Sequence, residues 1–437
     1  MDELSKDNLL RSWKKIAAYL GCDIRTCHRW EHDHGMPVHR AERGGTKSPV
    51  FAYRDELDAW FRETFKSSNP PETGAPFSPW MKWAAAGAAI LVLAGAFFLL
   101  RGSRAPRQPA DFTIDGSFLV VLDKQKHELW RFDTKIEGLM PESFFRGEFQ
   151  SLSRDPGNAF PSLVIRDINE DGDIEVLFAP KNREEQTGLG RLYCLDRKGH
   201  EMWRFDAGKE LKCGAKVFSP DYRIPGFVCH DLDGDGRLET LVFAYQKPDW
   251  PCQMAVLDAS GRKVGEFWNS GYLKYPVFHD INGDGREELI VVGVNNEYRG
   301  GCLAVFDTRR ISGASPQSGD FACREYEPGS ELYYVTVPYA DVSAAVGNVV
   351  DGFHYAFITG NDRISATHSL NLFYEFDFGL ACTQVSWGHG FQNLHDELSK
   401  AGKISSVLNA DYARSFKEGV RYWNGAAWTA VPSMNRR

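Results

Sequence analysis

Hydrophobic positions at helical spacing open the chain. Ile16, Ala17 and Leu20 recur on one helical face, Ser12 stands where an N-cap belongs, and Gly21 ends the segment. We therefore predict a helix that begins after Ser12 and ends at a tight turn.

A second short helix is predicted over residues 24–31, with Asp23 as its cap. Ile24, Cys27 and Trp30 share its predicted inner face. The side chains left facing outward are those of Arg25, Thr26, His28 and Arg29. Two short helices joined by a glycine-containing turn are typical of a helix-turn-helix.

Alternating apolar residues then predict two strands, 37–40 and 50–53, around the basic, glycine-rich tip 42–47. A closing helix over 56–65 follows, with Asp55 as its cap. Helices and a hairpin together predict a small α+β domain over residues 1–66.

The middle of the chain is uniformly apolar. No charged residue interrupts Trp83 to Leu100, and 18 residues of helix at about 1.5 Å per residue match a bilayer core. We predict a transmembrane helix within 80–101, with linkers at 67–79 and 102–110. A signal peptide does not fit this position, whereas a buried core helix stays open as an alternative.

Beyond residue 111 the pattern changes to short strands. Three acidic segments begin at Asp167, Asp231 and Asp280, spaced 64 and 49 residues apart, and each runs into an apolar strand. A second repeat interleaves with them, a strand and an Asp-containing turn followed by Glu-Leu-Trp-Arg-Phe-Asp or a close variant. Repeats of this length built from short strands predict a large all-β, propeller-like domain over 111–437, with five to seven blades.

Oxygen-bearing side chains occupy alternate positions of the acidic segments, which suits a hard cation such as Ca²⁺. Glycine at the sixth position permits a sharp turn, and the seventh position supplies a backbone carbonyl. The predicted metal-binding positions are Asp167, Asn169, Asp171, Asp173 and Glu175, then Asp231, Asp233, Asp235, Arg237 and Glu239, then Asp280, Asn282, Asp284, Arg286 and Glu288. Plain Asx-type turns are the alternative, and magnesium fits an all-protein cage less well.

Two resemblances sharpen these expectations. The run IAAYLGCDIRTCHRWEHDHGMPVHR resembles the winged helix-turn-helix of MerR-type regulators and phage excisionases. The resemblance implies a second helix in the DNA major groove. The DNA-contacting residues it implies are Arg25, Thr26, His28, Arg29, Arg40, Arg43 and Lys47. A helix-turn-helix that only packs against protein, as an adaptor, is the alternative.

The acidic loops and strand repeats together resemble the FG-GAP/VCBS family of integrin-like propellers, which implies calcium in the loops. The tryptophan repeats also look like quinoprotein-type blades, from which no cofactor residue can be transferred. The strand near 118–122 is expected to close the ring against a hairpin at 419–428, and residues 391–402 are expected to be helical.

Charge and cysteine content add limits. Residues 1–79 carry 12 basic and 12 acidic side chains, so the chain's net charge of −8 comes from the later part, which suits a cation better than nucleic acid. A zinc site at Cys22, Cys27, His28, His32 and His34 matches no standard spacing. Seven cysteines follow the apolar segment, and their pairing cannot be read from the sequence.

The resulting hypothesis is a single-pass cell-membrane sensor-regulator, with a cytoplasmic DNA-binding domain and an extracytoplasmic calcium-binding propeller for an unknown ligand or protein partner. The positive-inside rule weakly favours the opposite orientation. A homodimer stays open. The alternatives are an adhesion or carbohydrate-binding propeller with an N-terminal adaptor, and thirdly a hydrolytic or quinoprotein enzyme. Because no catalytic motif is present, a non-enzymatic role is expected.

Overall fold

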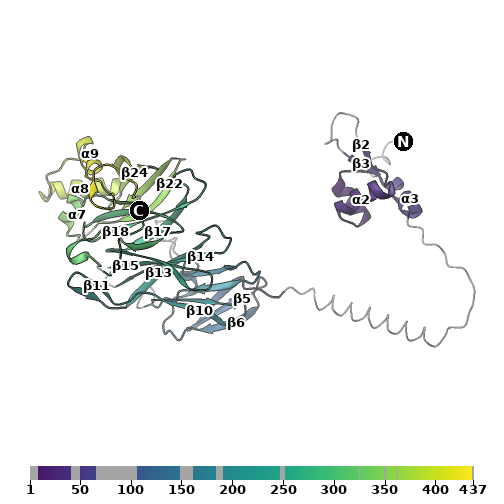
Figure 1. Cartoon of the computed structure of the whole chain (residues 1–437), viewed down its shortest axis with the longest axis horizontal. Helices are drawn as coiled ribbons and strands as arrows, with labels where there is room; N and C mark the ends of the chain where they lie inside the picture. The colour runs from purple at the N-terminus through teal and green to yellow at the C-terminus, as the bar shows by residue number, and fades with distance from the viewer. Residues whose placement is uncertain are drawn as a thin grey trace, which may run out of the picture. The chain divides into compact units, whose positions relative to one another are not determined.

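The computed structural model describes residues 8–40, 50–64, 106–147, 161–183, 190–246, 251–323, 325–348, 351–360 and 362–435. The chain forms two compact units, residues 1–104 and 105–437, which are drawn together in Figure 1.

The described residues of the N-terminal unit form a three-stranded sheet and three helices. Its elements are β1 (Leu9–Arg11), α1 (Trp13–Leu20), α2 (Ile24–His34), β2 (His39–Arg40), β3 (Val50–Tyr53) and α3 (Arg54–Thr64). The sheet order is β1-β3-β2, so β3 is the central strand between antiparallel neighbours. The predicted pair of helices and hairpin are confirmed, whereas β1 was missed because three residues show no clear period.

The caps of the first two helices follow the sequence expectation. The Ser12 hydroxyl accepts from the Lys15 amide, and Asp23 accepts from the Thr26 amide at 2.8 Å. Gly21 ends α1 and Gly35 ends α2, both in the left-handed conformation that glycine adopts without strain. The chain therefore turns at Gly21 between α1 and α2 and again at Gly35 after α2.

A small core holds the N-terminal unit together. Its buried members are Leu10, Ile16, Ala17, Cys27, Met36, Ala52 and Leu57. Cys27 is completely buried as expected, but Ile24 is 42% exposed, which corrects its predicted inner position. Ile24 is the first residue of α2, where the helix has only begun to turn toward the core. The closing helix also begins earlier than predicted, at Arg54.

The described residues of the C-terminal unit form five main β-sheets, numbered here in chain order, whose strands pair antiparallel except for the short last strand of sheet 3. Sheet 1 comprises β4 (Asp111–Asp115), β5 (Phe118–Leu122) and β6 (Glu128–Asp133). Sheet 2 comprises β7 (Leu163–Arg166), β8 (Glu175–Phe178), β9 (Arg191–Leu195) and β10 (Glu201–Asp206). Sheet 3 comprises β13 (Tyr222–His230), β14 (Glu239–Gln246), β15 (Cys252–Leu257), β16 (Lys263–Asn269) and β20 (Ser312–Ala314).

The last two sheets are less regular. Sheet 4 comprises β17 (Leu273–His279), β18 (Glu288–Asn295), β19 (Gly300–Asp307), β21 (Tyr333–Thr336), β26 (Arg421–Trp423) and β27 (Trp428–Thr429). Sheet 5 comprises β22 (Phe353–Thr359), β23 (Arg363–His368), β24 (Leu372–Asp377) and β25 (Cys382–Trp387). The remaining elements are the hairpin β11 (Leu211–Cys213) and β12 (Lys216–Phe218), the helices α5 (Glu142–Phe145), α7 (Asp341–Val346), α8 (His389–Lys400) and α9 (Ala410–Gly419), and the 3-10 turn Gly319–Phe321.

Apolar layers join each sheet to the next. One layer packs Leu119 of sheet 1 against Phe178 of sheet 2, and others join sheets 2 and 3, 3 and 4, and 4 and 5. Strands that supply these layers are buried almost throughout, β14 and β18 in particular, because both of their faces are covered. Successive meander sheets that pack face to face make this a propeller-like all-β domain.

Two corrections concern this domain's ends. The expected ring closure is wrong, because β5 pairs with β4 and β6, while β26 pairs with β21 of sheet 4. The C-terminal hairpin and the helix near 391 are confirmed, but they complete sheet 4 and cover sheet 5 rather than meeting sheet 1.

The expected single-pass architecture is also corrected. Within the parts of the chain that the structure describes, no helix combines the length and apolar character that a membrane crossing requires. The segment predicted as a span, within 80–101, lies outside the described residues. The fold class is therefore a small α+β unit and a large β domain, and the membrane localisation is withdrawn.

Candidate functional site

The three acidic segments form loops of one design. They connect β7 to β8, β13 to β14, and β17 to β18, and we call them loops 1, 2 and 3. In each loop the first aspartate accepts two or more backbone N–H groups; Asp231, for example, accepts from Gly234 at 2.7 Å and Gly236 at 3.0 Å. These bonds draw the loop around the first carboxylate, as the repeated sequence predicts.

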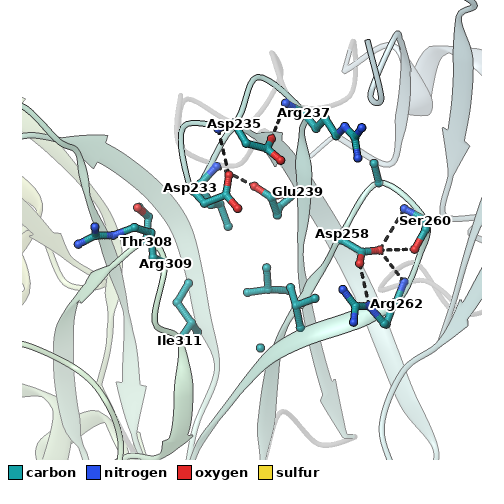
Figure 2. A pocket seen from close by; sticks show the side chains of 15 residues that line it. Asp233, Asp235, Arg237, Glu239, Asp258, Ser260, Arg262, Thr308, Arg309 and Ile311 are labelled. Atoms are coloured by element: carbon teal, nitrogen blue, oxygen red, sulfur yellow. Dashed lines mark hydrogen bonds and ion pairs between the residues drawn. The ribbon is translucent and has the colours of Figure 1, made fainter. Parts of the chain in front are cut away.

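In all three loops the side chains at positions three, five and nine each accept a hydrogen bond from a backbone N–H of the same loop. In loop 2, Asp233 accepts from the Asp235 amide at 3.1 Å and Asp235 from the Arg237 amide at 2.8 Å (Figure 2). Glu239, at position nine, accepts from the Leu232 amide at 2.9 Å. The fourth position has positive φ in every loop, which glycine accommodates in loops 2 and 3, whereas Glu170 must adopt it in loop 1.

The ninth-position glutamates are the buried carboxylates of the loops. Burial raises the pKa of the Glu175 carboxyl to about 7, and the neighbouring Asp171 and Asp167 carboxylates raise it further. Burial likewise raises the pKa values of Glu239 and Glu288, again with support from the aspartates of their own loops. Carboxylates that disfavour one another's charge in this way are a donor set suited to a hard cation.

Loop 2 gathers its carboxylates most closely. Oxygens of Asp231, Asp233 and Glu239 all lie within 4.8 Å of one another, the only such acidic or metal-binding group among the described residues. In loops 1 and 3 the third position is an asparagine, and its amide instead contacts a carboxylate: Asn282 donates to Glu288 at 2.6 Å. Loop 2 is therefore the loop in which three carboxylates approach one another without an intervening amide.

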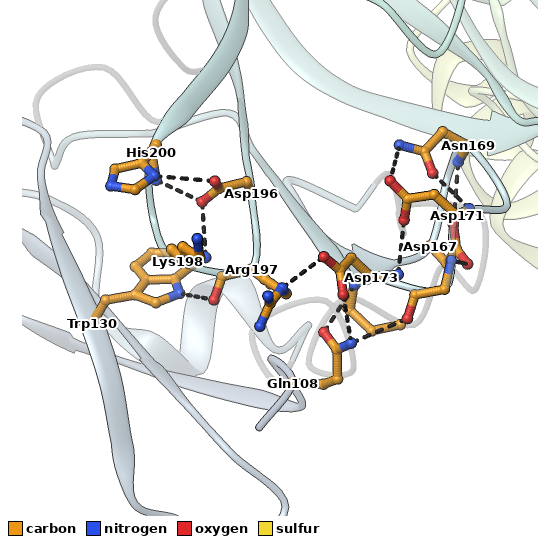
Figure 3. A network of polar contacts seen from close by, with 12 residues as sticks. Gln108, Trp130, Asp167, Asn169, Asp171, Asp173, Asp196, Arg197, Lys198 and His200 are labelled. Carbon is orange, nitrogen blue, oxygen red and sulfur yellow. Dashed lines mark hydrogen bonds and ion pairs between the residues drawn. The ribbon is translucent and has the colours of Figure 1, made fainter. Parts of the chain in front are cut away.

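One predicted ligand of loop 1 is directed elsewhere. Figure 3 shows Asp173 between Arg197, whose guanidinium is 2.6 Å away, and Gln108, whose amide donates at 3.1 Å. Both oxygens of Asp173 are thus engaged outside the loop. The side chains of Arg237 and Arg286 at position seven are exposed, as expected if that position offers only its backbone carbonyl.

The predicted DNA-contacting residues divide into three groups. Arg25, His28 and Arg29 are exposed on α2, whereas the Thr26 hydroxyl bonds to Asp23 at 3.1 Å and belongs to the helix cap. The His28 ring lies against Trp13 with a centroid separation of 4.1 Å.

The remaining three predicted DNA-contacting residues belong to the hairpin of β2 and β3, and the structure describes one of them. Arg40 pairs with Glu31 at 2.6 Å, while Arg43 and Lys47 lie outside the described residues. A groove of about 960 Å³ runs between α1 and α2 and is lined by Lys14, Arg25 and Arg29 among others. Among the described residues neither Arg25 nor Arg29 forms an ion pair, so both guanidiniums face solvent beside this groove.

The structure also gathers a polar cluster that the sequence did not reveal. His395 Nε2 lies 3.0 Å from the Ser406 hydroxyl, which donates to Asp341 at 2.5 Å; Tyr412 donates to the same carboxylate at 2.6 Å. The serine proton is directed to the aspartate and not to the histidine. This arrangement differs from that of a histidine-activated nucleophile, and the cluster joins α7, α8 and α9.

Comparisons with known proteins concern the fold alone. No family model and no curated protein matches the sequence. Among solved structures, BamB from Moraxella catarrhalis is similar at 11% identity and a TM-score of 0.28, over 65% of this chain and 65% of that one. The Dos1 propeller is similar at 9% identity and a TM-score of 0.32, over 62% of this chain and 65% of that one. The chain thus spans slightly less than two thirds of either neighbour.

Proposed function

We propose that this chain is a DNA-binding regulator whose propeller-like domain binds calcium and a ligand. The observation that carries the DNA part is the solvent-facing pair Arg25 and Arg29, placed on the helix whose opposite side buries Cys27. Guanidiniums that form no ion pair with a described carboxylate are available to phosphates and to guanine edges. The resemblance to MerR-type and excisionase winged helices supports the same assignment.

A salt-dependent DNA-binding measurement on the full chain tests this. Arg25→Ala combined with Arg29→Ala should weaken binding to a selected DNA site by about 1–3 kcal/mol per lost base contact. Arg62→Ala is the matched control, because Arg62 is an exposed arginine of α3 whose Nε donates to the Asp58 carbonyl. Equal affinities for all variants would contradict DNA reading and favour the adaptor role.

The calcium part rests on loop 2, where three carboxylates converge. Asp231, Asp233 and Glu239 would hold the ion, which would neutralise them and tie β13 to β14. Loops 1 and 3, with an asparagine at position three, would bind more weakly. The resemblance to FG-GAP loops supports calcium over magnesium.

Chelator should therefore lower the melting temperature of the full chain, and calcium should restore it. A site filled at a hundredfold excess over its Kd contributes about 2.7 kcal/mol. Asp233→Ala should blunt this response, whereas Asp362→Ala, at an exposed carboxylate beside Arg363, should leave it unchanged. Identical melting curves in chelator and in millimolar calcium would refute the metal assignment.

We assign no catalytic role. The motifs for hydrolysis or cofactor binding are absent from the sequence, and the Ser406 hydroxyl donates to Asp341. A binding function is the proposal that accounts for both domains.

A further inference from the structure

Two free cysteines of the N-terminal unit lie with their sulfur atoms in contact. The Sγ atoms of Cys22 and Cys27 are 3.4 Å apart, and neither cysteine belongs to a disulfide. Sulfur atoms in a disulfide are about 2.05 Å apart, so an approach of roughly 1.4 Å would bond the pair. The two thiols are thus already placed for a reaction with each other.

The backbone on both sides holds this pair at the turn between α1 and α2. Cys22 lies in the turn, and its amide donates to the Ala17 carbonyl at 3.0 Å. Cys27 lies in the first turn of α2, where its amide donates to the Asp23 carbonyl at 3.2 Å. Because these bonds belong to the ends of the two helices, the thiols stay next to each other and their effective concentration is high.

The two thiols differ in access. Cys27 is completely buried in the core of the N-terminal unit. Cys22 is partly exposed and lines the groove of about 960 Å³ between α1 and α2, beside Arg25 and Arg29. A reagent that enters this groove therefore reaches Cys22 first.

The chemistry of the pair assigns the same order. Burial, together with the hydrogen bond with Cys22, raises the pKa of the Cys27 thiol to about 12. The thiolate is the form that attacks a disulfide sulfur. Cys22 is thus the attacking cysteine, and Cys27 reacts only with a sulfur that Cys22 presents to it.

We propose that Cys22 and Cys27 form a redox-sensitive pair, which a small disulfide such as glutathione disulfide converts into an intramolecular disulfide that weakens DNA binding. The Cys22 thiolate attacks one sulfur of glutathione disulfide, which forms a mixed disulfide and releases one glutathione. Cys27 then attacks the Cys22 sulfur, breaks the mixed disulfide and releases the second glutathione. Two protein thiols are oxidised, one glutathione disulfide is reduced, and the two thiol protons end on the two glutathiones.

The new bond would alter the first turn of α2. It closes a short ring of backbone, residues 22–27, that carries both the helix cap and Arg25. The cap consists of the bonds from the Thr26 amide and hydroxyl to Asp23, at 2.8 and 3.1 Å. Drawing the two sulfurs together moves this turn relative to Arg29, one helical turn further along.

A shift of this kind matters because base contacts are geometrically strict. A bidentate contact between arginine and guanine is lost when its hydrogen bonds lengthen beyond about 3.5 Å. Arg25 and Arg29 would then no longer fit one DNA site together. The loss of one such contact corresponds to a fall in affinity of about tenfold. This consequence rests on the proposed DNA binding, whereas formation of the disulfide does not.

Peptide mapping of the full chain tests the bond directly. The chain is incubated with glutathione disulfide, its remaining thiols are alkylated, and it is digested with trypsin. Cleavage after Arg25 places Cys22 and Cys27 in separate peptides, residues 16–25 and 26–29, so mass spectrometry finds them linked only if the disulfide has formed. We expect the linked peptides in the oxidised chain, with DNA affinity at least tenfold lower, and both changes should be reversed by dithiothreitol.

Two serine variants identify the cysteine responsible. Cys22→Ser removes the attacking thiol, so its DNA affinity should be the same with and without glutathione disulfide. Cys229→Ser is the matched control, because Cys229 is also a free, partly exposed cysteine but lies in β13 of the C-terminal unit. This control should respond as the parent does. Both variants keep the disulfide between Cys213 and Cys323, so any effect of dithiothreitol through that bond is common to them.

The possible outcomes separate this proposal from the proposed function. Absence of the linked peptides from the oxidised parent refutes the disulfide, and linked peptides without a change in DNA affinity refute its regulatory effect. A response that persists in Cys22→Ser would assign it to another cysteine and overturn the proposal. If the reduced chain binds no DNA, the proposed function fails, while the linked peptides still decide by themselves whether the disulfide forms.

Discussion

The contact between Trp203 and Gly261 predicts a measurable energetic coupling between sheets 2 and 3. Trp203→Ala removes a half-buried indole and its hydrogen bond to the Ala259 carbonyl. Large-to-small changes at tryptophan cost about 3–5 kcal/mol when the ring is fully buried, so we expect about 3 kcal/mol here. Gly261→Ala should destabilise for two reasons, the positive φ of +80° and the overlap of the new Cβ with the indole.

These two contributions can be separated in a double-mutant cycle. An alanine at positive φ costs about 1–2 kcal/mol by itself, and only the overlap disappears once Trp203 is truncated. Gly261→Ala should therefore cost at least about 1 kcal/mol less in the Trp203→Ala background, a coupling typical of residues in contact. Urea unfolding followed by circular dichroism provides the free energies.

Gly116→Ala is the control for backbone strain. Gly116 also has positive φ, at +61°, but nothing lies within 4 Å of a Cβ placed there. Its cost should be the strain alone and should add to that of Trp203→Ala. If Gly261→Ala were as costly without the indole as with it, the tryptophan would not be docked on that turn.

Two further predictions concern the stability of the same domain. Cys213 and Cys323 form a disulfide across 110 residues of chain. Cys213→Ser should therefore lower the free energy of unfolding by up to about 4–5 kcal/mol, and reductant should no longer lower the stability of the variant. A variant that still loses stability in reductant as the parent does would contradict the pairing. Burial lowers the pKa of His368 to about 3, so the folded state stays neutral while the unfolded chain takes up a proton below its usual value near 6.5. Stability should fall by about 1.4 kcal/mol per pH unit from pH 6.5 downward on account of this residue, and His368→Gln should show a correspondingly shallower slope in urea unfolding.

Local signals in the sequence predicted the elements well. Ser12, Gly21 and Asp23 mark the ends of α1 and α2 because caps act through bonds to neighbouring residues. The acidic loops were found for the same reason, since positions one, three, five and nine bond within a nine-residue segment.

The pairing of strands and side chains that lie far apart in the sequence could not be predicted from such local signals. Nothing local distinguishes a hairpin that closes a ring from one that joins an internal sheet, and β26 pairs with β21 across more than eighty residues. Sequence periodicity likewise could not show that Asp173 turns to Arg197, or that His395 approaches Ser406, because each partner comes from a different element. The pairing of Cys213 with Cys323 is of the same kind.

The position at which the tryptophan repeat is interrupted could be interpreted only with the structure. Trp130 and Trp203, each the seventh residue after a turn aspartate, close the junctions of sheets 1 and 2 and of sheets 2 and 3, whereas glycine at that position, Gly265, leaves the third open. In the sequence this reads as a weak copy of the repeat. In the structure the Ile311 carbonyl lies so close to Gly265 that a Cβ at this position would overlap it. Loop 2, whose carboxylates lie closest together, borders the resulting cavity (Figure 2). At the two junctions that keep the tryptophan the indole contacts the next turn, whereas at the third the missing side chain leaves a cavity beside loop 2.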